Sequence, residues 1–371
     1  MTFAAAIIVA ALVFFTAWDL LDAGGLKPER RIDSKTLFDL VKLSFGVVAG
    51  AGALVALVVA YRRQRVDEDG AQRDATRLHT ERFTTAVAQL GEESAAVRLG
   101  GVHALAGLAD DAPTRELRQT CIDVLCAYLR LPYTAEADLS PNDADARRGY
   151  LAFREVRHTV IRLIRDHLRL APEHPNSWQG HDFDFTGVVF DGGDFSRAVF
   201  SSGTVRFTGS VFSSRSMDFR DTVFSGAEVS FYRAKFSGGR AFFDRATFSG
   251  SPVDLSETEF SGCRIRFQFA TFSDGMVSFA DALFSDGAAS FHFTGFNGGA
   301  VSFAGATFSG GIVEFPGARF LGSSVSFDGA HFSGGTVDLA RALGDRPPDV
   351  RPWTLGSLPA GLSLPSAWSV F

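Results

Sequence analysis

The sequence predicts a mainly β protein, a solenoid of short repeated strands, preceded by a small α-helical region and two N-terminal membrane-spanning helices. Phenylalanine recurs every twelve residues from Phe200 to Phe332, and Phe or Leu recurs seven residues after each of these positions. Two uncharged apolar segments lie near the N-terminus. A unit this short buries its apolar face only by stacking on its neighbours, as the units of a solenoid do.

Residues 3–18 and 43–61 contain no charged side chain, and each is close to the length that crosses the hydrocarbon core of a bilayer. No Lys or Arg precedes the first segment and no A-x-A pattern follows it, which favours a transmembrane helix over a signal peptide. We therefore expect residues 1–65 to form two spans with a connecting loop, in a multi-pass protein of the cell membrane. Gly46 and Gly50 could form a homodimer face in the second span, or could pack against the first span.

Two spans place both ends of the chain on one side of the membrane. The Lys and Arg residues beside the spans do not decide which side, because the loop and the exit from the second span carry similar numbers of them. Cys121, Cys126 and Cys263 form no disulfide framework, which suits a reducing cytosol. We expect the bulk of the chain, residues 62–371, to be cytoplasmic.

Residues 66–171 show the apolar period of helices and predict a helical region or linker. Apolar stripes predict short helices around residues 83–90, 99–109, 117–129 and 156–168. The pair spanning 95–131 is similar to one HEAT-type hairpin through the run V-R-L-G-G-V-H-A-L-A-G-L-A, and the polar residues 134–149 predict a loop. Arginines flank the last stripe and predict a solvated helix face, with a nucleic-acid or lipid patch as the alternative: Arg154, Arg157, Arg162, Arg165 and Arg169.

One unit of the repeat, from Phe303 to Phe315, has the pattern F-x-x-A-x-F-S-G-G-x-V-x-F. Alternate residues of an extended chain share a face, so each Phe and the small residue two places before it point inward. The Ser, Gly, Asp and Asn residues between them supply turns. The expected core ladder comprises Phe207, Phe212, Phe219, Phe224, Phe231, Phe236, Phe243, Phe248, Phe260, Phe267, Phe272, Phe279, Phe284, Phe291, Phe296, Phe303, Phe308, Phe315, Phe320, Phe327 and Phe332.

The coil length follows from packing. A coil of one unit would force two inward Phe into a very small cross-section, and interiors tolerate overpacking poorly. A coil of two units, twenty-four residues long with four faces, leaves room for four aromatic rings in one layer. At about 4.8 Å per layer, the array would be a rod on the order of 30 Å long.

The array begins with Phe185, Phe190, Phe195 and Phe200, which are spaced by five. This spacing, with Ala, Val or Gly two places before the Phe, resembles the pentapeptide-repeat family over residues 181–342. The resemblance implies a right-handed, four-sided β-helix with the central Phe or Leu inside. The chain departs from the family by alternating five with seven, so we expect two of the four corners to be enlarged. Residues 343–371 are predicted to be an irregular, Pro-rich C-terminal cap.

We find no catalytic pattern: no dinucleotide or Walker loop, no G-x-S-x-G and no H-E-x-x-H. We expect no enzyme activity, no cofactor and no metal. Cys121 and Cys126 are poorly spaced on a predicted helix for one metal ion, and burial as apolar thiols is expected. His181 and Asp182 could form an acid–base pair, but they open the solenoid, and a capping role is favoured.

Phe269 and Phe293 break the inward pattern, because each follows an inward Phe by two residues. On a coil of two units they would stack on one outer face, with Arg245 preceding them in the same column, where a cation–π contact could form. A small exposed apolar patch of this kind can mark a binding site for a partner. The alternative is a local stacking pair that stiffens the rod.

These features favour a membrane-anchored scaffold or interaction module with no chemistry of its own. Its expected partners are an unknown protein and the lipid bilayer, and nucleic acid is not expected. The resemblance supplies one alternative, since some pentapeptide-repeat proteins mimic duplex DNA and bind gyrase. Residues 181–341 contain 17 Asp and Glu against 12 Lys and Arg, a net charge of −5, whereas a 30 Å mimic would need roughly eighteen uncompensated charges. A third alternative is an enzyme domain within residues 74–170.

Overall fold

The computed structural model describes residues 33–134, 136, 139–140, 142–213, 215–250, 252–322, 324–344 and 358–368, together with Phe15, Thr16 and Asp19. The chain divides into two compact units between Arg73 and Asp74. The first predicted span, residues 3–18, lies almost entirely outside the described residues.

The predicted second span lies inside α2 (Ser34–Leu90), a single helix of 57 residues that crosses the boundary between the units. The short helix expected around residues 83–90 is therefore the last part of this longer helix. Residues 62–82 contain no Pro and are rich in Arg, Gln and Glu, which favour helix. Within the described residues, α2 is the one helix long and apolar enough to cross a membrane, and its apolar window has a mean hydropathy of 2.3 with none of it buried.

Three further helices precede the solenoid in the second unit: α3 (Ala95–Asp110), α4 (Arg115–Arg130) and α5 (Ala144–Leu168). The helical hairpin predicted over residues 95–131 corresponds to α3 and α4. The predicted loop at 134–149 is shorter than expected, because α5 already begins at Ala144. Asp143 caps this helix, and its carboxylate accepts a hydrogen bond of 2.8 Å from the N–H of Ala146.

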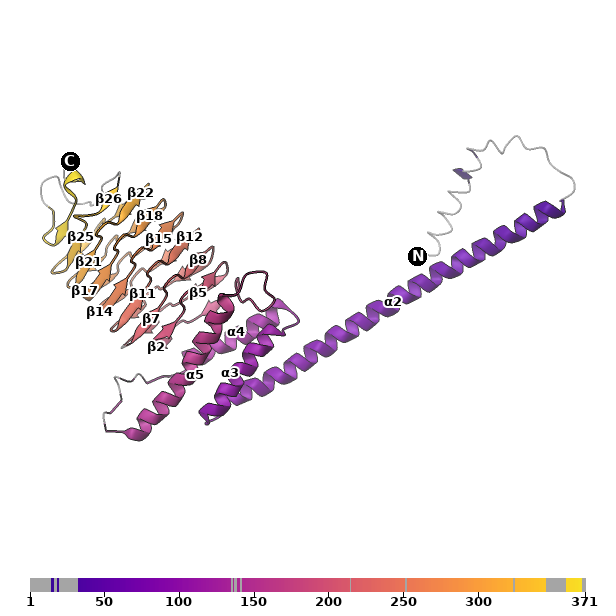
Figure 1. Ribbon diagram of the computed structural model, residues 1–371, viewed down its shortest axis with the longest axis horizontal. Helices are drawn as coiled ribbons and strands as arrows, with labels where there is room; N and C mark the ends of the chain where they lie inside the picture. The colour runs from indigo at the N-terminus through magenta and orange to yellow at the C-terminus, as the bar shows by residue number, and fades with distance from the viewer. Residues whose placement is uncertain are drawn as a thin grey trace. The chain divides into compact units, whose positions relative to one another are not determined.

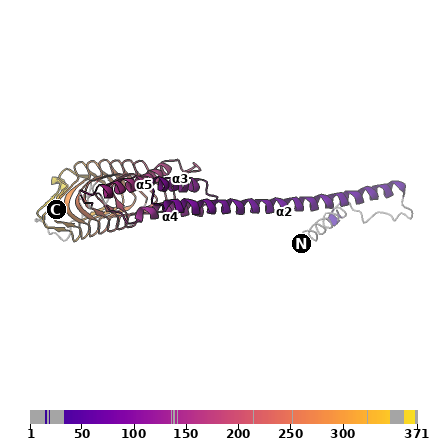
Figure 2. The same ribbon diagram turned by 90° about the horizontal axis from the view of Figure 1, so that it is seen from below.

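The solenoid consists of short parallel strands that follow one another in four columns and repeat in about seven turns (Figures 1 and 2). Column one contains β1 (Phe183–Asp184), β5 (Thr204–Arg206), β9 (Glu228–Ser230), β13 (Val253–Asp254), β16 (Met276–Ser278), β19 (Ala300–Ser302) and β23 (Ser324–Ser326). Column two contains β2 (Val189–Phe190), β6 (Val211–Phe212), β10 (Lys235–Phe236), β20 (Thr307–Phe308), β24 (His331–Phe332) and the first halves of β14 (Glu259–Arg266) and β17 (Leu283–Ser290).

Columns two and three belong to one sheet of 13 strands, because β14 and β17 run through both columns. Column three contains the second halves of β14 and β17 with β3 (Gly193–Asp194), β7 (Ser216–Asp218), β11 (Arg240–Phe242), β21 (Ile312–Glu314), β25 (Thr336–Asp338) and β27 (Leu362–Ser363). Column four contains β4 (Val199–Phe200), β8 (Val223–Ser225), β12 (Thr247–Ser249), β15 (Thr271–Ser273), β18 (Gly295–Asn297), β22 (Arg319–Leu321) and β26 (Leu343–Gly344).

The strand register confirms that one coil holds two units of the repeat. Phe248 pairs with Phe272, and Val253 pairs with Val277. Phe residues separated by two units stack inside the coil: the rings of Phe248 and Phe272 lie 4.7 Å apart and 5° from parallel. The residues of the expected ladder are buried, except that Phe332, on the last coil, is partly exposed. The core is therefore a stack of four-ring layers.

Both ends of the stack are covered. Helices α4 and α5 lie against β1 and β3 of the first coil, at the end of the solenoid away from the C-terminus (Figure 1). At the other end, β27 pairs with β25, and Trp368 packs edge-on against Phe320 at 5.8 Å. The indole N–H of Trp368 also donates to the carbonyl of Gly344. Trp368 thereby covers Phe320 at this end, while Phe332 stays partly exposed.

We predict that Phe279→Ala lowers the free energy of unfolding by about 3–5 kcal/mol, because the change leaves a cavity in a mid-array layer. Phe279 is buried and stacks on Phe303 at 4.8 Å. The matched control is Ser278→Ala, which removes a partly exposed hydroxyl bonded to Ser256 and should cost less than about 1 kcal/mol. Chemical denaturation of the two variants measures both values, and equal, small losses would contradict the prediction.

Candidate functional site

The candidate residues Phe269 and Phe293 occupy one column of turns, which follows column three. The backbone takes the same left-handed conformation at this position in six successive coils, with φ between 54° and 66° at Arg197, Asp221, Arg245, Phe269, Phe293 and Gly317. Residues separated by two units of the repeat thus occupy equivalent positions on the outside of the rod. The column holds charged side chains in its first three coils, two aromatic rings next, and then a glycine.

Phe269 and Phe293 point outward and stack on each other. They are 57% and 58% exposed, and their ring centroids lie 5.2 Å apart with the planes 10° from parallel. The ring of Phe293 also covers Gly317, since a Cβ added to that glycine would lie 2.7 Å from the ring. The two rings form a continuous apolar surface over three coils.

The packing of the solenoid does not require these two rings. A bulky residue with positive φ is uncommon, and the left-handed conformation costs an L-residue roughly 1–2 kcal/mol. Stacking of the two rings stabilises the folded state by about 0.5–1.5 kcal/mol, and neither ring lies in the core. Glycine stands at the equivalent position of the next coil, where it meets no such cost. Neither core packing nor turn geometry therefore explains Phe at both positions.

Arg245 lies in the same column, as expected, but its guanidinium points toward the preceding coil. It donates two hydrogen bonds to the carboxylate of Asp221, at 2.6 and 2.8 Å, and these bonds raise the pKa of Arg245. Within the described residues, Arg245 makes no cation–π contact with Phe269. The structure thus brings the two rings together but not the arginine.

The structure also reveals charged residues that we did not single out from the sequence. Arg240 and Arg264 are exposed neighbours on β11 and β14, and their Cα atoms are paired in the register. Neither side chain has an ion-pair partner within the described residues. Phe242 lies between Arg220 and Arg266, whose guanidinium groups are 5.7 and 4.7 Å from its ring. The separation of Arg240 from Arg264 by two units of the repeat was the available sequence signal.

Together these outward residues form one surface, which we name the column-three face. It includes strand residues and the turn residues that follow them: Arg240, Phe242, Arg264, Arg266, Phe269, Phe293 and Ile312. Ile312 is exposed on β21. Arg266 is paired with Asp244, so Arg240 and Arg264 carry the uncompensated positive charge of this face.

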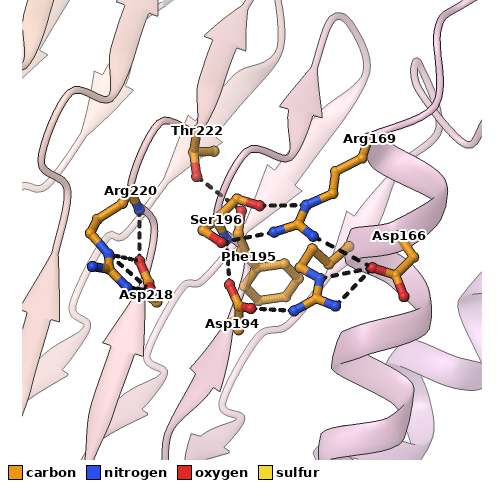
Figure 3. A network of polar contacts seen from close by, with 9 residues as sticks. Asp166, Arg169, Asp194, Phe195, Ser196, Asp218, Arg220 and Thr222 are labelled. Atoms are coloured by element: carbon orange, nitrogen blue, oxygen red, sulfur yellow. Dashed lines mark hydrogen bonds and ion pairs between the residues drawn. The ribbon is translucent and has the colours of Figure 1, made fainter.

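Arg162 of α5 is exposed, as expected for a solvated helix face, but the expectation is wrong for Arg157, which is buried. Arg165 and Arg169 contact the first coil of the solenoid. Arg157 is buried and donates to the carbonyls of Leu129 and Val189, at 2.6 and 2.7 Å. Arg169 donates to the carbonyl and the hydroxyl of Ser196, both at 2.8 Å, and Arg165 pairs with Asp194 (Figure 3). Because turns of the first coil leave carbonyl and carboxylate oxygens at the end of the solenoid, α5 supplies the donors that satisfy them.

A second polar cluster joins α5 to the first coils around Asp191, whose side chain is buried. The hydroxyls of Tyr133 and Tyr150 both donate to its carboxylate, and Arg215 lies 3.5 Å from it. Burial and the hydrogen bond to Asp191 raise the pKa of Tyr150 to about 12. Both hydroxyls thus remain donors at physiological pH, and the cluster acts as a structural clamp.

The remaining candidates are structural as well. His181 contacts the Gln119 side-chain oxygen at 3.0 Å, and the carboxylate of Asp182 accepts from the N–H of Thr204 at 2.7 Å. Burial, with the charges of Arg115 and Arg118, lowers the pKa of His181 to about 4, so the ring is neutral at pH 7. Burial raises the pKa of the thiols of Cys121 and Cys263 to about 11 and that of Cys126 to about 12. Buried, protonated thiols are unreactive.

No protein-family model matches the chain, and a search of curated proteins finds no similar sequence. Among the residues that the structure describes, no group of three or more His, Cys, Asp or Glu side chains is placed to hold a metal ion. The outward rings and arginines of the solenoid are therefore the strongest basis for a functional proposal.

We predict that Arg157→Ala lowers the free energy of unfolding by about 2–5 kcal/mol, because it leaves two buried carbonyls without a donor. Arg162→Ala on the same helix is the matched control, since Arg162 is exposed and its hydrogen bond goes to Thr159 within α5. Its expected cost is below about 0.5 kcal/mol. Thermal or chemical denaturation compares the two, and equal destabilisation would show that Arg157 is not a clamp.

Proposed function

We propose that the protein is a membrane-anchored scaffold, a non-enzymatic interaction module that presents the side of a β-solenoid to a protein partner. The observation that carries the proposal is the exposed Phe269–Phe293 stack, which the core does not use and whose backbone conformation disfavours it. Aromatic and Arg side chains carry much of the binding energy at protein interfaces. Solenoids commonly bind through such extended lateral surfaces.

The membrane anchor is the second part of the proposal. We propose two spans, residues 3–18 and 43–61, with the remainder of the chain in the cytoplasm. The support is the apolar, unburied window of α2 and the absence of charge in residues 3–18. Cys121, Cys126 and Cys263 are unpaired and buried, which is compatible with a reducing compartment. Dimerisation of the second span through Gly46 and Gly50 is a further option within this proposal.

The type, handedness and cross-section of the coils are the third part of the proposal. We propose coils of the pentapeptide-repeat type, right-handed and four-sided in cross-section. The five-residue spacing of the first Phe residues and the four strand columns per coil support it. Enlarged corners are supported by β14 and β17, which run through columns two and three and contain the inserts S-G-C at 261–263 and S-D-G at 285–287.

A DNA mimic that binds gyrase is the alternative, and the charge arrangement of the solenoid argues against it. Acidic side chains along the rod are paired with basic ones from neighbouring coils: Asp221 with Arg245, Glu257 with Arg233, and Glu259 with Lys235. A mimic of duplex DNA needs a row of uncompensated negative charge. Among the described residues, column three carries unpaired charges of both signs, with Arg240 opposed to Arg264 and Glu314 opposed to Asp338.

We predict that the protein stays in the membrane fraction after washing at alkaline pH, and that its solenoid is cytoplasmic. The test is a Met276→Cys variant, because Met276 is exposed and the three native thiols are buried. An impermeant thiol reagent should label this variant only after cell lysis. Labelling of intact cells would place the solenoid outside the cell. Release by the wash would show that the protein is not anchored in the membrane.

We predict that the double change Phe269→Ser, Phe293→Ser abolishes capture of protein partners in cells while leaving the fold intact. Serine has a Cβ and keeps the cost of the left-handed conformation, so only the ring stacking is lost and the free energy of unfolding should fall by less than about 1.5 kcal/mol. Proximity labelling in native cells compares the double variant with a Met276→Ser control. If the wild type and the double variant label the same set of proteins, the scaffold assignment for this face is contradicted.

A further inference from the structure

We propose that the column-three face also binds the surface of an anionic lipid bilayer, with Arg240 and Arg264 contacting lipid phosphates and Phe269 and Phe293 entering the interfacial region. This inference rests on the membrane anchorage proposed above, and it assigns a lipid ligand to the same outward surface. The solenoid would then lie against the bilayer through one defined side.

The arginine pair is the first observation that carries the inference. Arg240 and Arg264 are directly opposed on adjacent strands of the sheet, and like charges opposed in this way destabilise a sheet. Like charges are also opposed at Asp194–Asp218 and Glu314–Asp338, but Asp194 and Asp218 each form an ion pair with an arginine. In the described structure, these two guanidinium groups instead point to solvent without an acidic partner. Two such groups side by side suit an external anion, and phosphate is the anion that arginine binds in a bidentate manner.

The unpaired positive charge is local to this arginine pair. Arg266 is neutralised by Asp244, and Arg245 by Asp221. His292 and Glu314 contact each other at 3.4 Å. The carboxylate of Asp286, at the turn before the second half of β17, accepts from the N–H of Gly287. Asp338, opposed to Glu314 on β25, has no ion-pair partner among the described residues.

The aromatic pair is the second, independent observation. Phe269 and Phe293 stand on a turn and are more than half exposed, so they project from the rod beyond the strands. Ile312 adds a further exposed apolar side chain to the same face. Aromatic and aliphatic side chains flanked by arginines are the combination that binds at the boundary between lipid headgroups and acyl chains. Arginine can keep its charge at the phosphates while its apolar stem lies lower.

A bilayer is the favoured occupant because the same chain carries an apolar helix suited to span one. Because the solenoid would be linked covalently to the membrane anchor, its effective concentration at the membrane surface is high, and even weak contacts with lipid become populated. The cytoplasmic leaflet is negatively charged, and it attracts nearby Arg and Lys side chains. A protein partner with an acidic and apolar surface is the competing occupant, and the experiment separates the two.

The experiment uses the full chain reconstituted into vesicles that contain a lipid with a nitroxide quencher on its headgroup. An environment-sensitive fluorophore is attached to Ile312→Cys on the column-three face or to Met276→Cys in column one. The two positions are matched, because both are the exposed first residues of three-residue strands whose second residue is buried. The native thiols are buried and do not compete for the label.

In vesicles of phosphatidylcholine with about one third phosphatidylglycerol, we expect quenching at Ile312 to be at least about three times that at Met276. The difference should shrink in pure phosphatidylcholine and at high salt. Arg240→Gln with Arg264→Gln, and separately Phe269→Ser with Phe293→Ser, should each reduce quenching at Ile312 to the level at Met276.

Equal quenching at the two positions, or none at Ile312 in anionic vesicles, would overturn the lipid proposal. Capture of protein partners is measured separately, so the two failures are distinguishable. Loss of capture in the phenylalanine double variant without lipid-dependent quenching would make this face a protein interface only. Lipid-dependent quenching with unchanged capture would support the lipid role and remove the scaffold role from this face.

Discussion

The structure depends on the stacking of each inward phenylalanine on the one that lies two units of the repeat further along the chain. The rings are nearly parallel and about one strand spacing apart, as for Phe267 and Phe291 at 4.8 Å and 3°. A coil this narrow has no second layer of side chains, so each coil buries its apolar surface only between two others. The pairing of the strands in register then follows, since a slip would remove every ring from its stack.

The same constraint arranges the surface. Once the register is set at two units per coil, every outward position and every turn position becomes a column, and neighbours in a column are separated in sequence by one full coil. Exposed ion pairs follow this spacing, as with Arg233 and Glu257, and each contributes little to stability. Because the core tolerates almost any outward residue, the identity of those residues is free to reflect binding.

Much of the solenoid could be predicted because its signal is local and repeated. The period of twelve, combined with the size of a phenylalanine ring, was enough to derive the coil of two units and the outward direction of Phe269 and Phe293. The sequence predicts the span at 43–61 and the helix around 83–90 as separate elements, whereas they belong to one helix, because residues 62–82 contain no Pro and favour helix. The role of the α5 arginines could not be predicted from the helix alone. Arg157 is buried by the loop and the first coil that pack on it, and its acceptors, Leu129 and Val189, are distant in sequence.

The two ends and the sides of the rod are under different physical constraints. At the ends, unpaired strands and exposed rings would invite aggregation, so polar clamps from α5 cover one end and the indole of Trp368 covers the other. On the sides, the strands pair with those of neighbouring coils, and outward side chains face the solvent. There, two features run against stability: phenylalanine in a left-handed turn, and arginine opposed to arginine. Both occur on the same side of the rod and in the central coils, away from the ends that need covering. Their coincidence on one surface is the strongest structural reason to assign binding to that side rather than to the ends.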